Sequence, residues 1–267
     1  MGKTLGIISI KGGVGKTTIA TSLASDLVNN FQKKVLLIDA NYSAPNIGFH
    51  MDILKPEKTI HDVLANKARI KSAIHNRFGV DVIPGSYIFQ TPFNMLKLRD
   101  KIRSLKDDYD FIILDSSPSL NDEVLSTILA SDNLFVVSTP DYPTLYCSLK
   151  AAKLAKQRGR PISGIILNKI RDPSHELTLR EIEQTTEIPV VAKISDNKIA
   201  IRSAFTRIPI PVYDKRSKFA KEISNLSSAI TNIKERRSIL SLILPNFRRE
   251  QVNRQILKES FYTSYFS

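Results

Sequence analysis

Short runs of apolar residues, each about the length of one β-strand, recur along most of the chain. They are dominated by Val, Ile, Leu and Phe and cover residues 5–10, 35–38, 80–83, 111–114, 134–137, 162–167 and 190–194. Most of them lack the alternation of apolar and polar residues that marks a strand with one solvated face. Continuous apolar strands are typical of a parallel sheet that is covered on both faces.

Longer stretches with helical patterns separate these runs. They include residues 18–30, 93–104, 121–130, 144–158 and 176–187, each long enough for a crossover helix. The alternation predicts a doubly wound α/β fold, with a mostly parallel sheet flanked by helices on both faces. Because no internal repeat or low-complexity linker interrupts the pattern, we expect one domain over residues 1–237.

The pattern changes after Pro211. Apolar residues then recur at spacings of three and four, which predicts one stripe of a long helix, formed by Phe219, Ile223, Leu226, Ile230 and Ile233. The stripe resumes at Leu240 and Leu244, and Pro245 is expected to end the helix. Residues 238–267 then form a basic tail with apolar and aromatic residues, which we expect to bind a membrane or a partner rather than to stabilise the fold.

The composition narrows the setting in which this domain works. The 267 residues carry 39 Lys and Arg against 26 Asp and Glu, a formal net charge of +13 that favours anionic partners. The single Cys excludes an internal disulfide. No apolar run approaches the roughly 18 residues that span a bilayer, and the chain starts with a strand pattern rather than a signal peptide. We therefore expect a cytoplasmic protein whose membrane contact is peripheral.

A glycine-rich segment, Lys11-Gly-Gly-Val-Gly-Lys-Thr-Thr18, separates the first predicted strand from the first predicted helix. Its ending matches the phosphate-binding loop of P-loop proteins, although Lys11 stands where that loop usually has its first glycine. Glycines let backbone N–H groups converge on phosphate oxygens, and a helix start adds a positive dipole end. We expect phosphate contacts from Gly12, Gly13, Val14, Gly15, Lys16, Thr17 and Thr18, with the Lys16 charge on the outer phosphates and the Thr17 hydroxyl on Mg²⁺.

Two predicted strands end in a carboxylate. Asp115 follows the apolar run 111–114 in the manner of a Walker B strand, and Asp39 follows the run 35–38 in the same way. Open α/β sheets bind ligands at the carboxyl ends of their strands. We therefore expect Asp39 and Asp115 to hold Mg²⁺ together with Thr17, directly or through water.

These motifs resemble those of the MinD/ParA family of deviant Walker A ATPases, and the MinD side more closely, over about residues 1–235. The most specific feature is Lys11, because the corresponding lysine of that family reaches across an ATP-sandwiched homodimer to the partner's phosphates. Residues 111–120 are similar to the family's switch II stretch, with Ser117 in place of a proline. Residues 192–204 and the following Ile208-Pro209-Ile210 are similar to its base-pocket segment.

The resemblance implies an ATPase with a P-loop NTPase fold, with ATP and Mg²⁺ as ligands and an ATP-dependent homodimer in which Lys11 and Lys16 serve catalysis. It also implies a spatial-positioning switch of the cell-division type. Such a switch acts peripherally on the inner face of the cell membrane, here through the C-terminal tail. An activating protein partner is implied as well, and the sequence does not identify it.

One position departs from the family pattern. The family usually carries Asp-x-Asp after the second strand, and its second Asp helps to position the attacking water, whereas this chain has Asp39-Ala-Asn41. An amide can hold a water by hydrogen bonding but cannot accept its proton. Unless another side chain substitutes for it, we expect hydrolysis to be slower by about 10²–10⁴-fold.

The base specificity rests on the segment Asn168-Lys-Ile-Arg-Asp172. It approaches the guanine motif Asn-Lys-x-Asp, but Arg171 occupies the position of the required carboxylate. We therefore favour ATP, and the resemblance places Asn168 at the adenine edge. The other interpretation of Asn168 is a turn residue at the end of a strand.

Two alternatives compete with the MinD-like interpretation. A ParA-like partition ATPase would bind DNA nonspecifically through the basic cluster in residues 198–221, formed by Lys198, Arg202, Arg207, Lys215, Arg216, Lys218 and Lys221. The same cluster is also compatible with a merely solvated face. A tyrosine-kinase-like member of the fold is less favoured, because only Tyr262 and Tyr265 support it. His61, His75 and His175 lack a metal-like spacing and are expected at the surface.

Overall fold

One eight-stranded sheet runs through the computed structural model of the chain, which describes residues 1–160, 162–172 and 174–232. The strand order is β3-β4-β2-β5-β1-β6-β7-β8. The bounds are β1 (Lys3–Ile8), β2 (Val35–Ala40), β3 (His75–Arg77), β4 (Val80–Ile83), β5 (Phe111–Ser116), β6 (Asn133–Ser138), β7 (Ile162–Ile170) and β8 (Val190–Ser195). All of these pairings are parallel except β3 with β4. The predicted α/β class with a mostly parallel sheet is confirmed.

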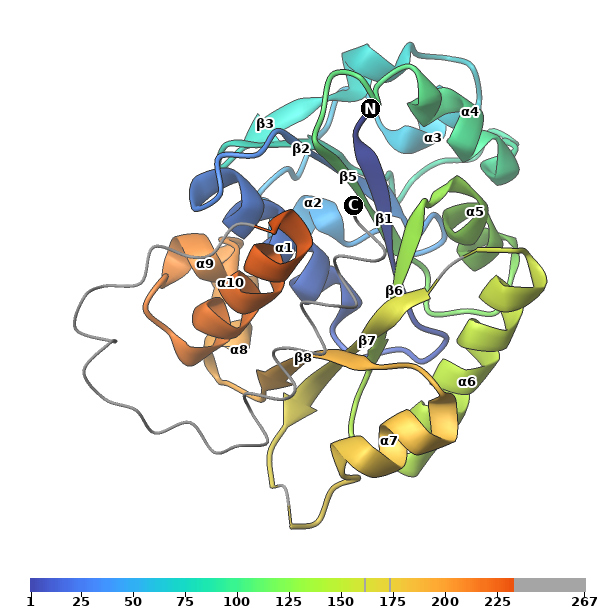
Figure 1. Cartoon of the computed structure of the whole chain (residues 1–267). Helices are drawn as coiled ribbons and strands as arrows, with labels where there is room; N and C mark the ends of the chain where they lie inside the picture. Colours follow the sequence, from blue (N-terminus) through green and yellow to red (C-terminus); the bar gives the residue numbers. More distant parts are fainter. Residues whose placement is uncertain (161, 173, 233–267) are drawn as a thin grey trace.

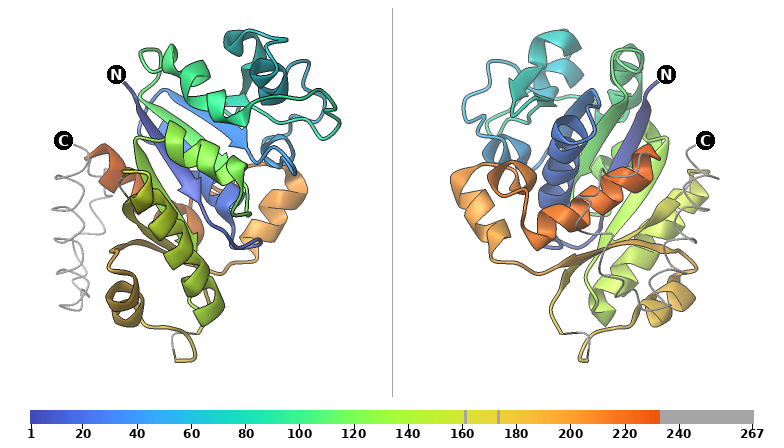
Figure 2. Two further views of the ribbon diagram at one scale, coloured as in Figure 1. Left: turned by 90° about the vertical axis from the view of Figure 1, so that its right-hand side faces the viewer. Right: turned by 60° about the vertical axis from the view of Figure 1, so that its left-hand side comes forward.

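Helices cover both faces of this sheet (Figures 1 and 2). One face carries α1 (Lys16–Asn29), α2 (Ile47–His50), α8 (Ile199–Thr206), α9 (Ile210–Tyr213) and α10 (Lys218–Thr231). The other face carries α3 (Ile60–Leu64), α4 (Leu98–Arg103), α5 (Asp122–Ala130), α6 (Tyr142–Gln157) and α7 (Leu179–Thr186), with the short 3₁₀ turns η1 (Ile70–Ala73) and η2 (Met95–Lys97). This layered arrangement leaves the two edges where strands begin and end open for ligands.

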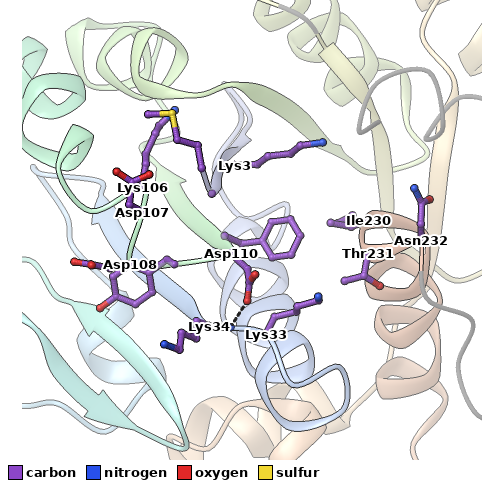
Figure 3. Close-up of a pocket in the computed structure, with 14 residues that line it drawn as sticks. Lys3, Lys33, Lys34, Lys106, Asp107, Asp108, Asp110, Ile230, Thr231 and Asn232 are labelled. Carbon is purple, nitrogen blue, oxygen red and sulfur yellow. Dashed lines mark hydrogen bonds between the residues drawn. The ribbon is translucent and has the colours of Figure 1, made fainter.

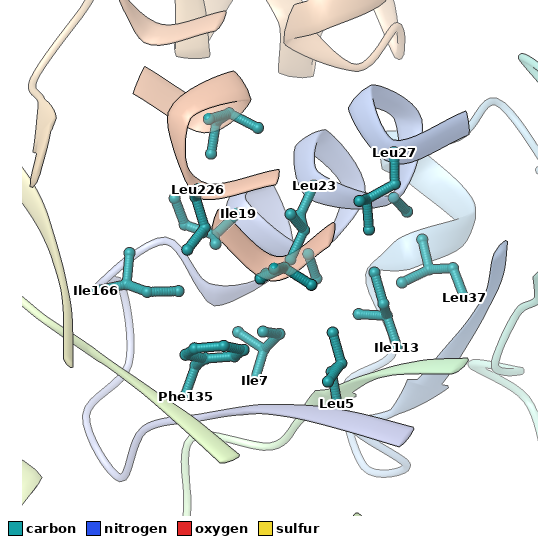
Figure 4. Packing of buried hydrophobic residues seen from close by; sticks show 14 of the residues in the cluster. Leu5, Ile7, Ile19, Leu23, Leu27, Leu37, Ile113, Phe135, Ile166 and Leu226 are labelled. Carbon is teal, nitrogen blue, oxygen red and sulfur yellow. The ribbon is translucent and has the colours of Figure 1, made fainter. Parts of the chain in front are cut away.

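The core beneath α1 and α10 shows why the strands are apolar on both sides. Leu5 and Ile7 of β1 point toward Leu23 of α1 and Leu226 of α10, and all four are at most 1% exposed (Figure 4). Ile8, by contrast, belongs to the cluster on the opposite face. A fully buried side chain of this size contributes about 1.5–3 kcal/mol to the stability of the fold. Strand β1 therefore stabilises the packing of helices on both faces of the sheet.

The structure differs from the sequence prediction at several element ends. The first helix begins at Lys16 rather than Thr18, so both Lys16 and Thr17 lie in its first turn. Helix α10 ends at Thr231, because Asn232 takes a left-handed conformation with φ of 55°, which asparagine adopts more readily than most residues. The predicted continuation to Leu244 and the tail 238–267 lie outside the described residues.

Candidate nucleotide site

The glycine-rich loop connects β1 to α1 at the carboxyl edge of the sheet. Gly15 precedes the helix in a left-handed conformation with φ of 94°. The Asn168 side chain, from β7, donates a hydrogen bond from Nδ2 to the carbonyl oxygen of Val14 over 2.8 Å. A Cβ on Gly15 would lie only 2.4 Å from the same Nδ2. The loop conformation therefore requires glycine at position 15 for two separate reasons.

Two lysines of the site differ in their surroundings. Lys16 is 7% exposed, and burial lowers the pKa of its ammonium, an effect that the nearby Asp115 partly offsets. Lys169, which follows Asn168, donates from Nζ to the carbonyl oxygen of Gly13 over 2.7 Å. Lys169 could not be predicted from the sequence, because a lysine at a strand end carries no motif of its own.

The two predicted carboxylates lie side by side on adjacent strands. Asp39 and Asp115 are register partners on β2 and β5, and both are fully buried. Burial, reinforced by the charge of Asp115, raises the pKa of Asp39 to about 8. Burial also raises the pKa of Asp115 to about 6, although the Thr17 hydroxyl and the Lys16 ammonium both favour its charged form. The carboxyl edge of the sheet thus concentrates acidic groups that would be stabilised by a cation.

The contacts of Thr17 and Asp115 fit a Mg²⁺ ion. The Thr17 hydroxyl donates to Oδ2 of Asp115 over 2.6 Å, while Oδ1 of Asp115 is buried without a hydrogen-bond partner among the described residues. A buried, unpartnered carboxylate oxygen beside a hydroxyl supplies the hard oxygen ligands that Mg²⁺ takes, with phosphate and water completing the shell. When bound, Mg²⁺ neutralises charge on the outer phosphates. Thr17 and Asp115 would hold it here.

Asp39 also binds the backbone of the loop that follows β2. Its Oδ1 accepts a hydrogen bond from the backbone N–H of Asn41 over 3.2 Å, and its Oδ2 accepts from those of Asn46 and Ile47, both over 2.9 Å. These three bonds fold residues 41–47 into a tight loop that leads into α2. A direct bond from Asp39 to a metal would have to compete with them.

Asn41 lies inside that loop and is 6% exposed. Its Nδ2 donates to the carbonyl oxygen of Ala44 over 2.5 Å, so the amide group is fixed by its own loop. A carboxylate could not make this hydrogen bond, because it has no proton to donate. The surroundings of position 41 therefore fit an amide side chain better than a carboxylate.

Lys11 points away from its own loop toward the start of α6. Its ammonium donates to Oγ1 of Thr144 over 2.8 Å and to Oδ1 of Asp141 over 3.3 Å. The side chains of Lys11 and Asp141 are 40% and 44% exposed. A pair this exposed contributes only about 0–1 kcal/mol, so the lysine can exchange these partners for a stronger anion. Asp141 and Thr144 could not be predicted from the sequence, because they lie more than a hundred residues from Lys11 in the chain.

The expectation that His61 lies at the surface was wrong. The ring is 2% exposed, and its Nε2–H donates to the carbonyl oxygen of Tyr42 over 3.0 Å, while Nδ1 accepts from the backbone N–H of Ser86. Burial lowers the pKa of this ring, which is consistent with a neutral histidine. The Ser43 hydroxyl binds the buried carboxylate of Glu123 on α5. The contacts of His61 with Tyr42 and of Ser43 with Glu123 hold in place the loop that carries Asn41.

Pro209, predicted from the base-pocket segment, lies immediately before α9. It is buried, and α9 packs against α1, the helix that starts at the glycine-rich loop. This arrangement brings the segment to the same side of the sheet as the loop. The contact of Pro209 and Asn168 with a base stays a prediction.

A pocket of about 450 Å³ lies at the opposite edge of the sheet, where β1 and β5 begin (Figure 3). Lysines and aspartates line it, and the backbone N–H of Lys34 donates to Asp110 over 2.8 Å. The six residues of β1 separate it from the glycine-rich loop by about 20 Å. It therefore takes no part in phosphate binding.

At the carboxyl edge, a glycine loop leads into a helix and places a buried lysine beside a Thr–Asp pair. This combination places the molecule in the class of P-loop proteins that bind nucleotides. Residues 2–153 match the protein family described as AAA domain. An uncharacterised ATP-binding protein of Methanocaldococcus jannaschii is 30% identical over 85% of this chain and 87% of its own length.

Two solved structures are similar over nearly their whole length. The cell division ATPase MinD of Pyrococcus furiosus superposes with a TM-score of 0.83 at 29% identity, covering 88% of this chain and all of that one. The septum site-determining protein MinD of Pyrococcus horikoshii, complexed with Mg-ADP, gives 0.82 at 27% identity, covering 86% and 96%. The chain belongs to the MinD/ParA family of P-loop ATPases, whose members bind nucleotide and Mg²⁺.

The raised carboxyl pKa values predict two opposite trends with pH. Between about pH 6 and pH 8, the affinity for Mg·ATP should rise, because a cation favours the ionised forms of Asp115 and Asp39. Over the same range the ligand-free protein should lose unfolding free energy. A carboxyl whose folded pKa is raised stabilises the fold below its unfolded value near 4, and that contribution is lost as the pH rises through the folded pKa.

Calorimetry and thermal unfolding across this pH range would measure both trends. Asp39→Asn is the control, because an amide does not titrate and part of each trend should vanish. If Mg·ATP affinity and the free energy of unfolding depend on pH in the same way in that variant and in the wild type, the trends do not arise from Asp39.

Proposed function

We propose that the chain is a nucleotide switch that forms a homodimer with ATP and separates after slow hydrolysis. The observation that carries the proposal is Lys11. Its ammonium is held by Asp141 and Thr144 at the start of α6 rather than by its own loop, and its side chain is 40% exposed, so it would be available to a second molecule. The family likeness supports the same role, since the characteristic lysine of MinD/ParA proteins reaches a partner's phosphates.

ATP with Mg²⁺ should therefore raise the scattering mass to twice the 30.0 kDa of the monomer, and ADP should not. Lys11→Ala should weaken this ATP-dependent dimer at least about tenfold, since a lost charge-assisted contact costs about 1.5–3 kcal/mol. Lys153→Ala is the matched control. It removes an exposed lysine from α6, the helix whose Thr144 contacts Lys11, and the variant should dimerise as the wild type does. A monomer at saturating ATP would contradict the proposal, and so would a Lys11→Ala protein that dimerises normally.

We further propose that this switch acts peripherally at the inner face of the cell membrane, as a positioning device of the cell-division type with an activating protein partner. The basic and apolar tail 238–267 and the MinD relatives support this setting. None of the helices in the described residues is both long and apolar enough to cross a membrane.

The alternative is nonspecific DNA binding by the basic cluster of residues 198–221. Sedimentation with anionic vesicles and with duplex DNA, each with ATP and with ADP, separates the two. ATP-dependent sedimentation with vesicles supports membrane action, and sedimentation with DNA alone would favour the partition-type alternative. Ending the chain after Arg236 should reduce vesicle binding and leave ATP binding intact.

A further inference from the structure

Helix α8 exposes apolar side chains instead of burying them. Ile201 is 72% exposed and Phe205 is 88% exposed, whereas Ser203 is the buried residue of this helix. At 3.6 residues per turn, Ile201, Phe205, Lys198 and Arg202 fall within an arc of about 100°. One face of α8 therefore presents two large apolar groups beside two cations.

The surroundings of α8 extend this face. Helix α9 contacts both α8 and α10 and carries Val212 and Tyr213, which are 39% and 40% exposed. Four more cations of the basic cluster follow, Lys215, Arg216, Lys218 and Lys221, all exposed. We call the exposed parts of residues 198–221 the α8 surface. Figure 1 shows α8, α9 and α10 together at the left side of the molecule.

Most of this charge is not neutralised by the protein. Within the described residues, Lys198, Arg202, Lys215, Arg216 and Lys221 form no ion pair, whereas Arg207 pairs with Asp52 and Lys218 lies 3.9 Å from Glu222. An anionic partner is therefore the complementary one. That partner must also offer an apolar environment to the exposed side chains of Ile201 and Phe205.

We propose that the α8 surface contacts anionic lipid, with Phe205 and Ile201 inserted at the level of the headgroups; this inference rests on the proposed action at a membrane. Basic residues beside exposed Phe and Leu or Ile side chains are the composition of helices that lie in a bilayer interface. A DNA backbone would satisfy the cations but would leave the isolated aliphatic Ile201 in water. The lipid surface matches both features.

The place of the surface makes it a second attachment point. It reaches into the first turn of α10, whose 14 residues span about 21 Å, and the tail follows the other end of that helix. Two weak contacts on one chain reinforce each other, because the second binds at high effective concentration. The α8 surface would thus orient the domain on the membrane, which a single attachment point does not.

A tryptophan placed in the full-length chain would test this directly, because the sequence contains none. With ATP and Mg²⁺, Phe205→Trp should shift its emission to shorter wavelength on vesicles of phosphatidylglycerol and phosphatidylcholine, and acyl-brominated lipid should quench it. Ile88→Trp, at a site that is 85% exposed in the segment between β4 and η2, is the matched control and should change little. Phe205→Ser should lower vesicle affinity about three- to tenfold, while Ile88→Ser leaves it unchanged.

The outcomes separate this inference from the proposed membrane function. If the Phe205→Trp protein sediments with vesicles but its tryptophan is not quenched, the role of the α8 surface is overturned and the membrane proposal stands. Absence of sedimentation would overturn both. Quenching of the tryptophan by duplex DNA, or a change in its emission on ATP-dependent dimerisation without vesicles, would assign the surface to nucleic acid or to a second copy instead.

Discussion

Lys16→Ala should lower the affinity for ATP·Mg²⁺ by at least about 100-fold. The Lys16 ammonium is nearly buried and lies beside Asp115, so its charge acts on phosphate through a medium less polar than water. Losing a buried charge partner costs about 3–5 kcal/mol, and each 1.4 kcal/mol is a factor of ten. Isothermal calorimetry with ATP and Mg²⁺ measures the change.

Two controls make the result specific to the site. Lys34→Ala removes an exposed lysine at the opposite edge of the sheet and should bind ATP as the wild type does. Thermal unfolding of Lys16→Ala without ligand should show a folded protein. If the folded variant retains wild-type affinity, the glycine-rich loop is not the nucleotide site.

Asn41→Asp should have the second largest effect. It should raise the rate of ATP hydrolysis and lower the stability of the fold. Phosphate release at saturating ATP should rise by about 10²-fold, because a carboxylate orients water and accepts its proton better than an amide. The same change should reduce the free energy of unfolding by about 1–3 kcal/mol, since the hydrogen bond from Nδ2 to the Ala44 carbonyl is lost. ATP affinity should stay within a few-fold.

Asn46→Asp provides a matched control for this variant. Its Nδ2 also donates to the Ala44 carbonyl, over 2.9 Å, but the residue is exposed. Hydrolysis should therefore stay at the wild-type level and stability should change little. A wild type that already releases phosphate as fast as Asn41→Asp would show that another group orients the water.

The sequence was sufficient for those parts of the site that depend on local order. Gly15-Lys16-Thr17 follows an apolar strand directly, and Asp39 and Asp115 end strands whose continuous hydrophobicity already indicates a parallel sheet. Such features need only neighbours along the chain. Their meeting at one edge follows from the topology of the sheet.

The parts that could not be predicted depend on contacts between distant segments or on weak local signals. The strand β3 was missed because His75-Asn-Arg77 is short and polar, and its pairing with β4 is antiparallel. The burial of His61 follows from contacts with Tyr42 and Ser86, which its own neighbours do not encode. The partners of Lys11 belong to this group as well.

Gly15 has a consequence for how this loop can change over evolutionary time. The collision with Asn168 and the left-handed backbone are independent obstacles to a side chain at this position. A smaller residue at 168 would remove the first obstacle and leave the second, while also removing the hydrogen bond that holds the Val14 carbonyl. No single companion substitution removes both obstacles, so we expect position 15 to remain glycine wherever this loop is kept.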